Sequence, residues 1–441
     1  MNIFKLSWKN ILAKPLNSLM SVLLFSLSIG LITFLLLFNH QFKKGLDNNL
    51  AGVDLVIGAK GSPLQLILNS MYHIDAPTGN INLANAGPFL NPAHPLLSTA
   101  IPLSLGDSYG AFRIVGAPQS ILPFYNADKI QGSIYKKDFE VVAGSIVAEK
   151  LHLHVGDEFF STHGLEDNPD LAHDHGNPFV ITGILQPSGT VLDQLILTTP
   201  QTVWKVHEHD STQSSDSHEG HDHPEGAHEH VSLPVTILDT NEIRALSDSI
   251  ISDLRRNSEK DITSMLLRFK SRTNIQSLNL LRNINVNTDM MAASPALEIN
   301  RLYAMMGSGA DAISYIAILI AIVAAISIFI SLYSSLKERR YEMAIMRVNG
   351  ATPSNIFQMI VGEGLWISIM GLLFGLLLGH GGIFLAGKIL EKSYRYQFTG
   401  AIWLPQEFYI IAGAIVIGII AAAIPAFQGS RTELHSTLAE G

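Results

Sequence analysis

The chain has 441 residues, of which 47% are hydrophobic and 15% are charged, and its net charge is −9 with the histidines neutral. This length accommodates two or three domains, and the apolar content excludes a disordered protein. The acidic balance gives no support to a nucleic-acid partner, and the absence of cysteine from the sequence excludes disulfides and thiolate metal sites. Because a typical soluble domain is about 25% charged, the deficit indicates membrane spans attached to a soluble part.

The N-terminal segment predicts an amphipathic cytoplasmic helix over residues 1–15 and a membrane span over residues 16–38. Pro15 to Phe38 contains no charged residue, and this run is longer than the apolar part of a secretory signal peptide. No small-x-small cleavage site follows it. We therefore expect the segment to be retained as the first span.

Residues 39–311 are expected to form one large α+β domain between the first and second spans. Short apolar runs bounded by turn residues predict strands at 53–59, 112–118, 157–162, 179–185, 194–199, 235–239 and 265–270. Apolar positions at helical spacing predict helices at 62–74, 146–153, 240–256 and 273–284. Ser62 suits the N-cap of the first helix, and Pro63 suits its first position.

A histidine-rich segment interrupts this domain. Residues 207–230 contain seven histidines and seven carboxylates without a Lys or Arg, and the low apolar content of residues 205–232 predicts a mobile loop. Because imidazoles bind zinc, copper and nickel, we interpret the segment as metal-binding; a solvated low-complexity loop and a pH-responsive loop are the alternatives. The candidate ligands are His173, His175, His207, His209, His218, His221, His223, His228 and His230.

Three further apolar stretches are long enough to cross a bilayer as helices. They cover residues 312–336, 356–387 and 408–427, separated by segments at 337–355 and 388–407 and followed by a tail at 428–441. Basic residues in the short flanks favour a cytoplasmic position for both termini and for the segment 337–355, which leaves 388–407 as a short external loop. The fold class expected is a four-span α-helical membrane part with a large extracytoplasmic (periplasmic) α+β domain.

The segment after the second span reads LKERRYEMAIMRVNGATP. Lys337 to Val348 suits a short amphipathic helix, Gly350 suits its C-cap, and Pro353 suits the start of the next helix. RRYEMAIMRVNGA at 339–351 resembles the (R)REIAxLRxxGA stretch of the MacB/FtsX-type permeases of ABC transporters. Four more stretches are similar to the same family: FKLSWKNILAKPLNSLMSVLLFSLSIG, EVVAGSIVAEKLHLHVGDEFF, FVITGILQPSGTVLDQLILTT and the closing AAIPAFQGSRTELHSTL. The histidine-rich insertions are not part of its pattern.

The resemblance implies a non-catalytic permease subunit in a bacterial inner membrane, working with a cytoplasmic ABC ATP-binding subunit. It implies a dimer, either of two copies of this chain or with a related permease, besides contacts with membrane lipid and with a periplasmic partner. The stretch after the second span docks on the ATP-binding subunit in that family, which assigns coupling to Lys337, Glu338, Arg339, Arg340, Glu342, Arg347 and Gly350. No G-x-x-x-x-G-K-[ST] phosphate loop occurs in the sequence, so we expect ATP hydrolysis in the partner.

Four more residues are singled out. His73 and Asp75, at the end of the helix predicted at 62–74, suit a fixed metal or cargo site, although the helix dipole explains His73 equally well. Glu363 suits a contact that relays coupling motion or, more simply, a paired interfacial acid. His380 is expected to be hydrogen-bonded within the third span. No tightly bound cofactor is expected, and zinc or another divalent transition metal is the ligand considered for the histidine-rich loop.

Two functions therefore stay open. The first is a permease subunit that couples ATP hydrolysis by its partner to motion of the external domain, for export or extraction of a substrate or for a metal-linked envelope function. The second is a membrane-anchored zinc-binding sensor or scaffold without an ATPase.

Overall fold

The structure, a computed structural model, describes residues 3–13, 15–50, 52–74, 76–162, 177–210, 233–394 and 398–431. The chain divides into two compact units, which are described separately. Unit 1 comprises residues 1–43 and 303–441, and unit 2 comprises residues 44–302. The split places both ends of the sequence in unit 1 and the predicted α+β insertion in unit 2.

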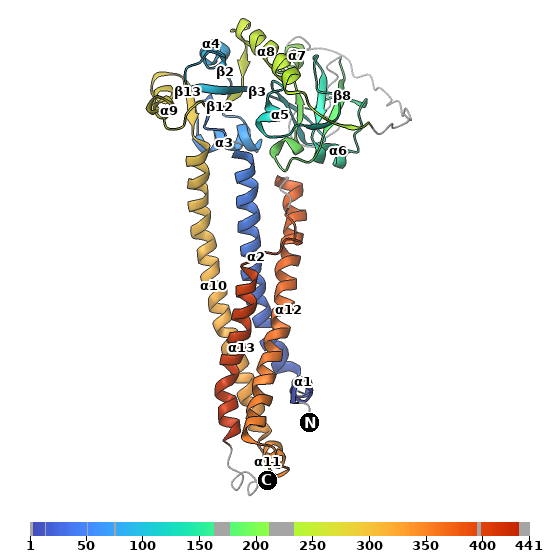
Figure 1. Ribbon diagram of the computed structural model, residues 1–441, viewed down its shortest axis with the longest axis vertical. Coiled ribbons are helices and arrows are strands. Elements are labelled where there is room, and N and C mark those ends of the chain that lie inside the picture. The colour runs from blue at the N-terminus through green and yellow to red at the C-terminus, as the bar shows by residue number, and fades with distance from the viewer. Residues whose placement is uncertain are drawn as a thin grey trace. The chain divides into compact units, whose positions relative to one another are not determined.

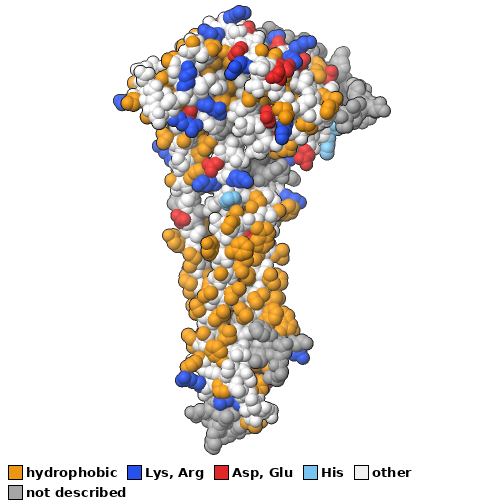
Figure 2. Space-filling view, viewed as in Figure 1, with side chains coloured by type: hydrophobic (Ala, Val, Ile, Leu, Met, Phe, Trp, Pro, Cys, Tyr) orange, Lys and Arg blue, Asp and Glu red, His pale blue; other side chains and the backbone are white. Residues whose placement is uncertain are grey.

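Unit 1 is built from helices that run side by side (Figure 1). They are α1 (Ile3–Ala13), α2 (Pro15–Leu50), α10 (Pro295–Glu338), α11 (Arg340–Val348), α12 (Pro353–Tyr394) and α13 (Glu407–Ser430), with the end of α2 and the start of α10 assigned to unit 2. Among the described residues, four helices, α2, α10, α12 and α13, have the length and apolar composition that a membrane span requires. Figure 2 shows hydrophobic side chains gathered over these helices, as contact with lipid requires.

All four helices are longer than the predicted spans, and α13, at Glu407–Ser430, extends least. α2 continues to Leu50, α10 begins at Pro295 and α12 continues to Tyr394. Hydropathy marks the part of a helix that suits a bilayer, whereas the helix itself continues as long as its backbone hydrogen bonds do. The span boundaries taken from the sequence are therefore narrower than the helices.

Glycines bring α12 close to α2. Gly371, Gly375 and Gly379 follow one another at four-residue intervals, and a Cβ added at any of them would fall within 2.7 Å of a side-chain atom of α2. Lipid is as apolar as leucine, so helices in a membrane associate through such close packing of small residues rather than through hydrophobic burial. Phe25 and Ile29 of α2 are accordingly buried against this stripe.

Unit 2 contains a mixed β-sheet with the strand order β10-β5-β8-β6-β9-β4-β3-β12-β1-β13, in which β7 also pairs with β8, and a separate pair β11-β2. Neighbours are antiparallel except for β4 with β9 and β6 with β8. The strands are β1 (Leu55–Ala59), β2 (Ile81–Asn82), β3 (Leu97–Tyr109), β4 (Phe112–Gly116), β5 (Lys129–Gly132), β6 (Glu140–Ala143), β7 (Glu158–Phe159), β8 (Phe179–Leu185), β9 (Ile196–Thr198), β10 (Val235–Ile237), β11 (Asp261–Ile262), β12 (Ser264–Phe269) and β13 (Met290–Ala293).

Helices cover this sheet and close two apolar cores. One core joins β1, β12 and β13 to α8 and α9, and the other joins β4, β6, β8 and β9 to α6 and α7. The helices are α3 (Pro63–Tyr72), α4 (Leu83–Ala86), α5 (Ile121–Phe124), α6 (Ser145–Leu151), α7 (Pro200–Asp210), α8 (Thr240–Arg256) and α9 (Ile275–Asn287), with short 3₁₀ turns η1 (Gly87–Leu90) and η3 (Val191–Gln194).

The predicted fold class is confirmed, because four candidate spans accompany a large α+β unit inserted between the first two. Each strand and helix predicted in unit 2 overlaps an observed element, and Ser62 caps α3 with Pro63 at its first position. The long strand β3 was not predicted.

The predicted loop at 205–232 begins too early. α7 continues to Asp210, because Val203 and Val206 are buried and Lys205 forms an ion pair with Asp138 at 2.5 Å. Residues 205–210 are therefore helical, and 211–232 lie outside the described residues.

Candidate coupling site

α11 is the short helix predicted after the second span. Beyond Val348 the chain turns back, with the Ala351 N–H donating to the Met346 carbonyl at 2.9 Å and the Gly350 N–H donating to the Arg347 carbonyl at 3.1 Å. Asn349 is the C-cap and Gly350 is the next residue, with φ +94°. The predicted C-cap is therefore off by one residue: Asn349 is the cap, and Gly350 follows it. A left-handed backbone at that following position ends the helix and favours glycine.

One face of α11 is packed into unit 1. Met343 and Ala344 are buried. Met343 belongs to a cluster with Leu336 of α10, Ile360 of α12 and Ala426 of α13. Because these side chains come from different helices, α11 is fixed to α10, α12 and α13 by apolar contact.

The opposite face of α11 is exposed and apolar. Tyr341, Ile345 and Val348 are 50%, 41% and 66% exposed, and their spacing of four and three residues places them on one side of the helix. Arg340 and Glu342, also exposed, lie beside them. An amphipathic helix with such a stripe is suited to a groove on a partner.

A buried carboxylate lies where α10, α11 and α12 meet. Glu363 of α12 is only 5% exposed, and its Oε1 accepts hydrogen bonds from Arg339 Nη1 at 3.1 Å and from Asn10 Nδ2 at 2.5 Å. Arg339, which separates α10 from α11, also donates through Nε to Glu342 at 3.0 Å. We call Asn10, Arg339, Glu342 and Glu363 the Glu363 junction.

α1 is fixed to α12 by further contacts beside this junction. The Ser7 hydroxyl donates to the Met359 carbonyl at 2.9 Å, and the rings of Trp8 and Trp366 lie 5.0 Å apart. Gly362 permits this approach, because a Cβ there would fall 2.8 Å from Ser7 Oγ. α1 is thus attached to the start of α12 along its length.

This arrangement suits the transmission of movement. An ion pair with little access to water is costly to break, since separating it leaves an uncompensated charge. The contact between Arg339 and Glu363 therefore holds the start of α11 to α12. Glu363 is thus paired, as one interpretation predicted, and its relay role stays a prediction.

Comparisons with known proteins agree with this part of the fold. Residues 314–434, which include α11 and Glu363, match the family described as FtsX-like permease C-terminal. The chain is also 26% identical over 137 residues to the ABC transporter permease YtrF of Bacillus subtilis (strain 168), over 28% of this chain and 31% of that protein. Together these matches support an FtsX/MacB-type permease family for this chain. The matched part spans about a third of the curated relative.

The remaining residues assigned to coupling lie at the end of α10 and along α11. Lys337 and Glu338 are exposed at the end of α10, and Lys337 Nζ lies 5.0 Å from the centre of the Tyr333 ring. Arg347 is half-buried on α11. Asn10 was not singled out from the sequence, where an asparagine in an amphipathic helix gives no signal of a distant carboxylate.

The predicted metal ligands are not brought together within the described structure. His173, His175, His218, His221, His223, His228 and His230 lie outside the described residues, and only the backbone of His207 and His209, in α7, is described. Within the described part of the chain, no three His, Asp or Glu side chains form a group that could hold a metal ion. Metal binding stays a prediction.

His73 ends α3 in unit 2, whereas Asp75 lies outside the described residues. His73 is the C-cap, with φ 51°, and its Nδ1 is buried with no hydrogen-bond partner among the described residues. Burial, reinforced by the positive charge of Arg113, lowers the pKa of His73 to about 3. The imidazole is neutral at neutral pH, so the attraction between a charged histidine and the helix dipole does not explain its position.

His380 of α12 is hydrogen-bonded, as expected, but its partners were not predicted. Its Nδ1 lies 2.7 Å from the Gly400 carbonyl oxygen, and its Nε2 lies 3.1 Å from Oε2 of Glu407, which is 1% exposed. The other oxygen of Glu407 accepts the Leu404 N–H at 3.0 Å. In the sequence, the feature that could have indicated this partner is Glu407 itself, a carboxylate directly before the apolar run of α13. This contact fixes the hairpin between α12 and α13.

Proposed function

We propose that this chain is the non-catalytic membrane subunit of an ABC-type complex, in which a separate cytoplasmic ATP-binding subunit docks on the exposed face of α11. The printed name of the Bacillus relative, an ABC transporter permease, supports this role. The observation on which the proposal depends is the stripe of Tyr341, Ile345 and Val348 on a helix whose other face is fixed to α10, α12 and α13.

Movement would enter the permease through the Glu363 junction. Rotation of α11 by the ATP-binding subunit would pull Arg339, which holds both Glu363 and Glu342. Since Asn10 is bonded to the same Glu363 oxygen as Arg339, α1 and α12 would move together. The buried cluster around Met343 would transmit the same displacement to α10 and α13.

The proposed topology places both termini and α11 in the cytoplasm of a bacterial cell and unit 2 outside its inner membrane. Two permeases, identical or related, would face two ATP-binding subunits. The cycle would drive export or extraction of a substrate by unit 2. The histidine-rich insertion adds a metal-linked envelope role as the alternative use of that motion.

Docking on α11 is tested with Ile345→Glu and Val348→Glu, each placed in the full chain and co-expressed with the ATP-binding subunit. Burying a carboxylate in an apolar contact is unfavourable, so we expect recovery of the ATP-binding subunit to fall at least about tenfold in affinity purification. Ile237→Glu, an equally drastic change at a 73% exposed position in unit 2, serves as the control. Undiminished recovery with both α11 variants would refute docking at this face.

The topology is tested separately by cysteine labelling, which the cysteine-free sequence makes straightforward. Asn349→Cys, next to α11, and Ser258→Cys, in unit 2, are both at exposed positions. A membrane-impermeant maleimide applied to intact cells should label position 258 and spare position 349 until the cells are opened. Labelling of position 349 from outside would overturn the cytoplasmic placement of α11.

A further inference from the structure

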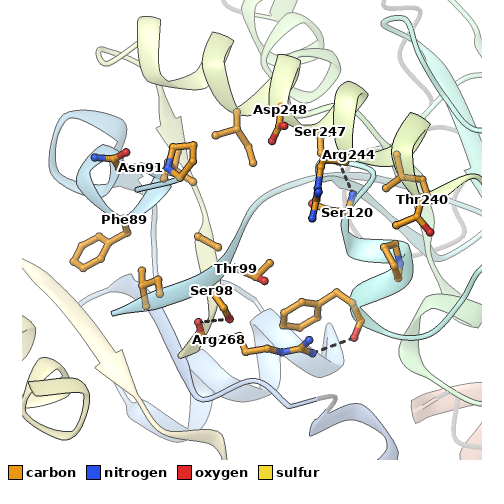
Figure 3. Close-up of a pocket in the computed structure, with 18 residues that line it drawn as sticks. Phe89, Asn91, Ser98, Thr99, Ser120, Thr240, Arg244, Ser247, Asp248 and Arg268 are labelled. Carbon is orange, nitrogen blue, oxygen red and sulfur yellow. Dashed lines mark hydrogen bonds between the residues drawn. The ribbon is translucent and has the colours of Figure 1, made fainter. Parts of the chain in front are cut away.

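Unit 2 contains a cavity of about 370 Å³ between β3, α5 and α8 (Figure 3). From Leu97 to Leu103, β3 pairs with β12, and β4 joins its other edge only from Ser104 onward. The two halves of the sheet therefore separate beside the first residues of β3, and Ser98, Thr99 and Ala100 line the gap. The volume is within the range of small-molecule sites.

Part of the cavity wall is apolar. Pro123 and Phe124 contribute from the α5 side, Ile243 and Ile251 from α8, and Phe89 from η1. These side chains offer contact area to a hydrocarbon or aromatic body. Burying apolar area contributes about 25 cal/mol per Å², so this part of the wall favours a ligand with an apolar portion.

Charged side chains of α8 stand at the same cavity. Arg244 and Asp248, one helical turn apart, are exposed and point from α8 toward the cavity in Figure 3. Within the described part of the chain, no ion pair or hydrogen bond engages either of them. Arg244 can therefore form a two-pronged contact with an incoming carboxylate without giving up an existing partner.

A second guanidinium lines the cavity in a fixed position. Arg268 lies over the Phe124 ring at 4.2 Å, and it donates to the Gly52 carbonyl at 3.3 Å and to the Phe124 carbonyl at 3.4 Å. Gly52 makes this possible, because a Cβ there would fall 3.3 Å from Arg268 Nη2. With two guanidiniums and one carboxylate, the charged lining has an excess of one positive charge.

Hydroxyl groups complete the polar side of the cavity. Ser247 Oγ accepts the Ser120 N–H at 2.7 Å, which leaves the Ser247 hydroxyl hydrogen available for donation. Ser120 Oγ is buried and has no hydrogen-bond partner within the described residues. The Ser247 hydroxyl is therefore the donor that lines the cavity beside Arg244.

We propose that this cavity binds a small amphiphilic carboxylate, whose anionic group contacts Arg244 and the Ser247 hydroxyl while its apolar body lies against Phe124 and Ile251. Asp248 disfavours a second negative charge and so favours monoanions. The proposal goes beyond coupling to an ATP-binding subunit, and binding is expected without nucleotide or partner.

The test uses the full chain in lipid nanodiscs, with empty nanodiscs subtracted, and isothermal titration with phenylbutyrate. Phenylbutanol has the same body without the charge, and phenylbutylamine has the opposite charge. A charge-assisted hydrogen bond contributes enough to change affinity by about tenfold or more, so phenylbutyrate should bind about tenfold more tightly than phenylbutanol. Equal affinity for acid and alcohol would overturn the proposal.

Four variants locate the binding. Arg244→Met, which keeps most of the side chain, should weaken phenylbutyrate about tenfold, whereas Arg256→Met, also exposed on α8 but outside the cavity, should leave it unchanged. Asp248→Asn should strengthen binding, because a repulsive charge is removed. Thr240→Trp, at an exposed position of the lining, should block it without changing charge. Full affinity in Thr240→Trp or in Arg244→Met would refute this site.

Discussion

The two units of this chain differ in where their large apolar side chains lie. In unit 2 large apolar side chains such as Leu267 and Ile181 fill the interior, and the sheet pairs the backbone. In unit 1 large apolar side chains cover the outside as well as packing between the helices, where serines, glycines and the Glu363 junction also lie. In the membrane part, the buried polar residues are therefore the ones that indicate a functional site. In the α+β part, a functional site is indicated by polar groups that have no partner.

The largest effect is expected from Arg339→Glu. It would place a second carboxylate against buried Glu363, and removing one partner of a buried ion pair costs about 3–5 kcal/mol. We expect a corresponding loss of thermal stability of the purified permease in nanodiscs, and loss of the ATP-binding subunit with it. Arg340→Glu, on the exposed side of the same segment, should leave thermal stability nearly unchanged.

The double variant Arg339→Glu with Glu363→Arg sharpens this result. It restores opposite charges in reversed order, so part of the lost stability should return. If the double variant is no more stable than Arg339→Glu alone, the direct contact between these two side chains is not what stabilises the junction.

His73 is expected to make unit 2 sensitive to acid. Its pKa of about 3 in the folded protein lies below the ordinary value of 6.5, so the unfolded chain binds the proton more readily. No stability is lost above pH 6.5, and the loss grows as the pH falls toward 3. Between pH 7 and pH 4 this one group should lower the free energy of unfolding by roughly 3 kcal/mol.

The matched variant is His73→Asn, since asparagine tolerates the left-handed backbone at this C-cap. Chemical unfolding of unit 2, followed at pH 7 and pH 4, should show a smaller acid effect in His73→Asn than in the unchanged chain. An identical pH dependence in both proteins would show that other groups control the acid sensitivity.

Gly350→Ala is expected to act more weakly and only on α11. The backbone at Gly350 has φ +94°, and a Cβ there would meet nothing within 4 Å, so the cost is conformational strain of about 1 kcal/mol. Hydrogen exchange should show faster opening of α11 with little change in unit 2. An unchanged exchange rate in α11 would mean that Gly350 is not needed to end the helix.

The smallest effect on stability is expected from deleting residues 211–232. The histidine-rich segment should account for most zinc bound by the permease, so zinc titration should show reduced stoichiometry after deletion. The thermal unfolding midpoint should stay the same without added metal, because α7 to Asp210 and β10 are retained. Equal zinc stoichiometry in both proteins would remove the metal-binding interpretation.

The sequence by itself determined the four spans, the insertion of an α+β part and the short helix after the second span. Runs such as Ala312–Leu336 and the capping residues Ser62 and Pro63 carry this information locally, because hydropathy and backbone preferences depend on adjacent residues. The same locality explains why β3 was missed: its long course from Leu97 to Tyr109 includes a proline and a glycine, which weaken a strand pattern.

Only the tertiary structure decided which polar groups meet. Asn10 and Glu363 are 353 residues apart in the chain, and the cavity beside Arg244 exists because β3 changes its partner between β12 and β4. Contacts of this kind depend on how elements pack, and no local pattern specifies them. The junction and the cavity, where the permease is proposed to receive motion and to bind a ligand, are for that reason products of the folded chain.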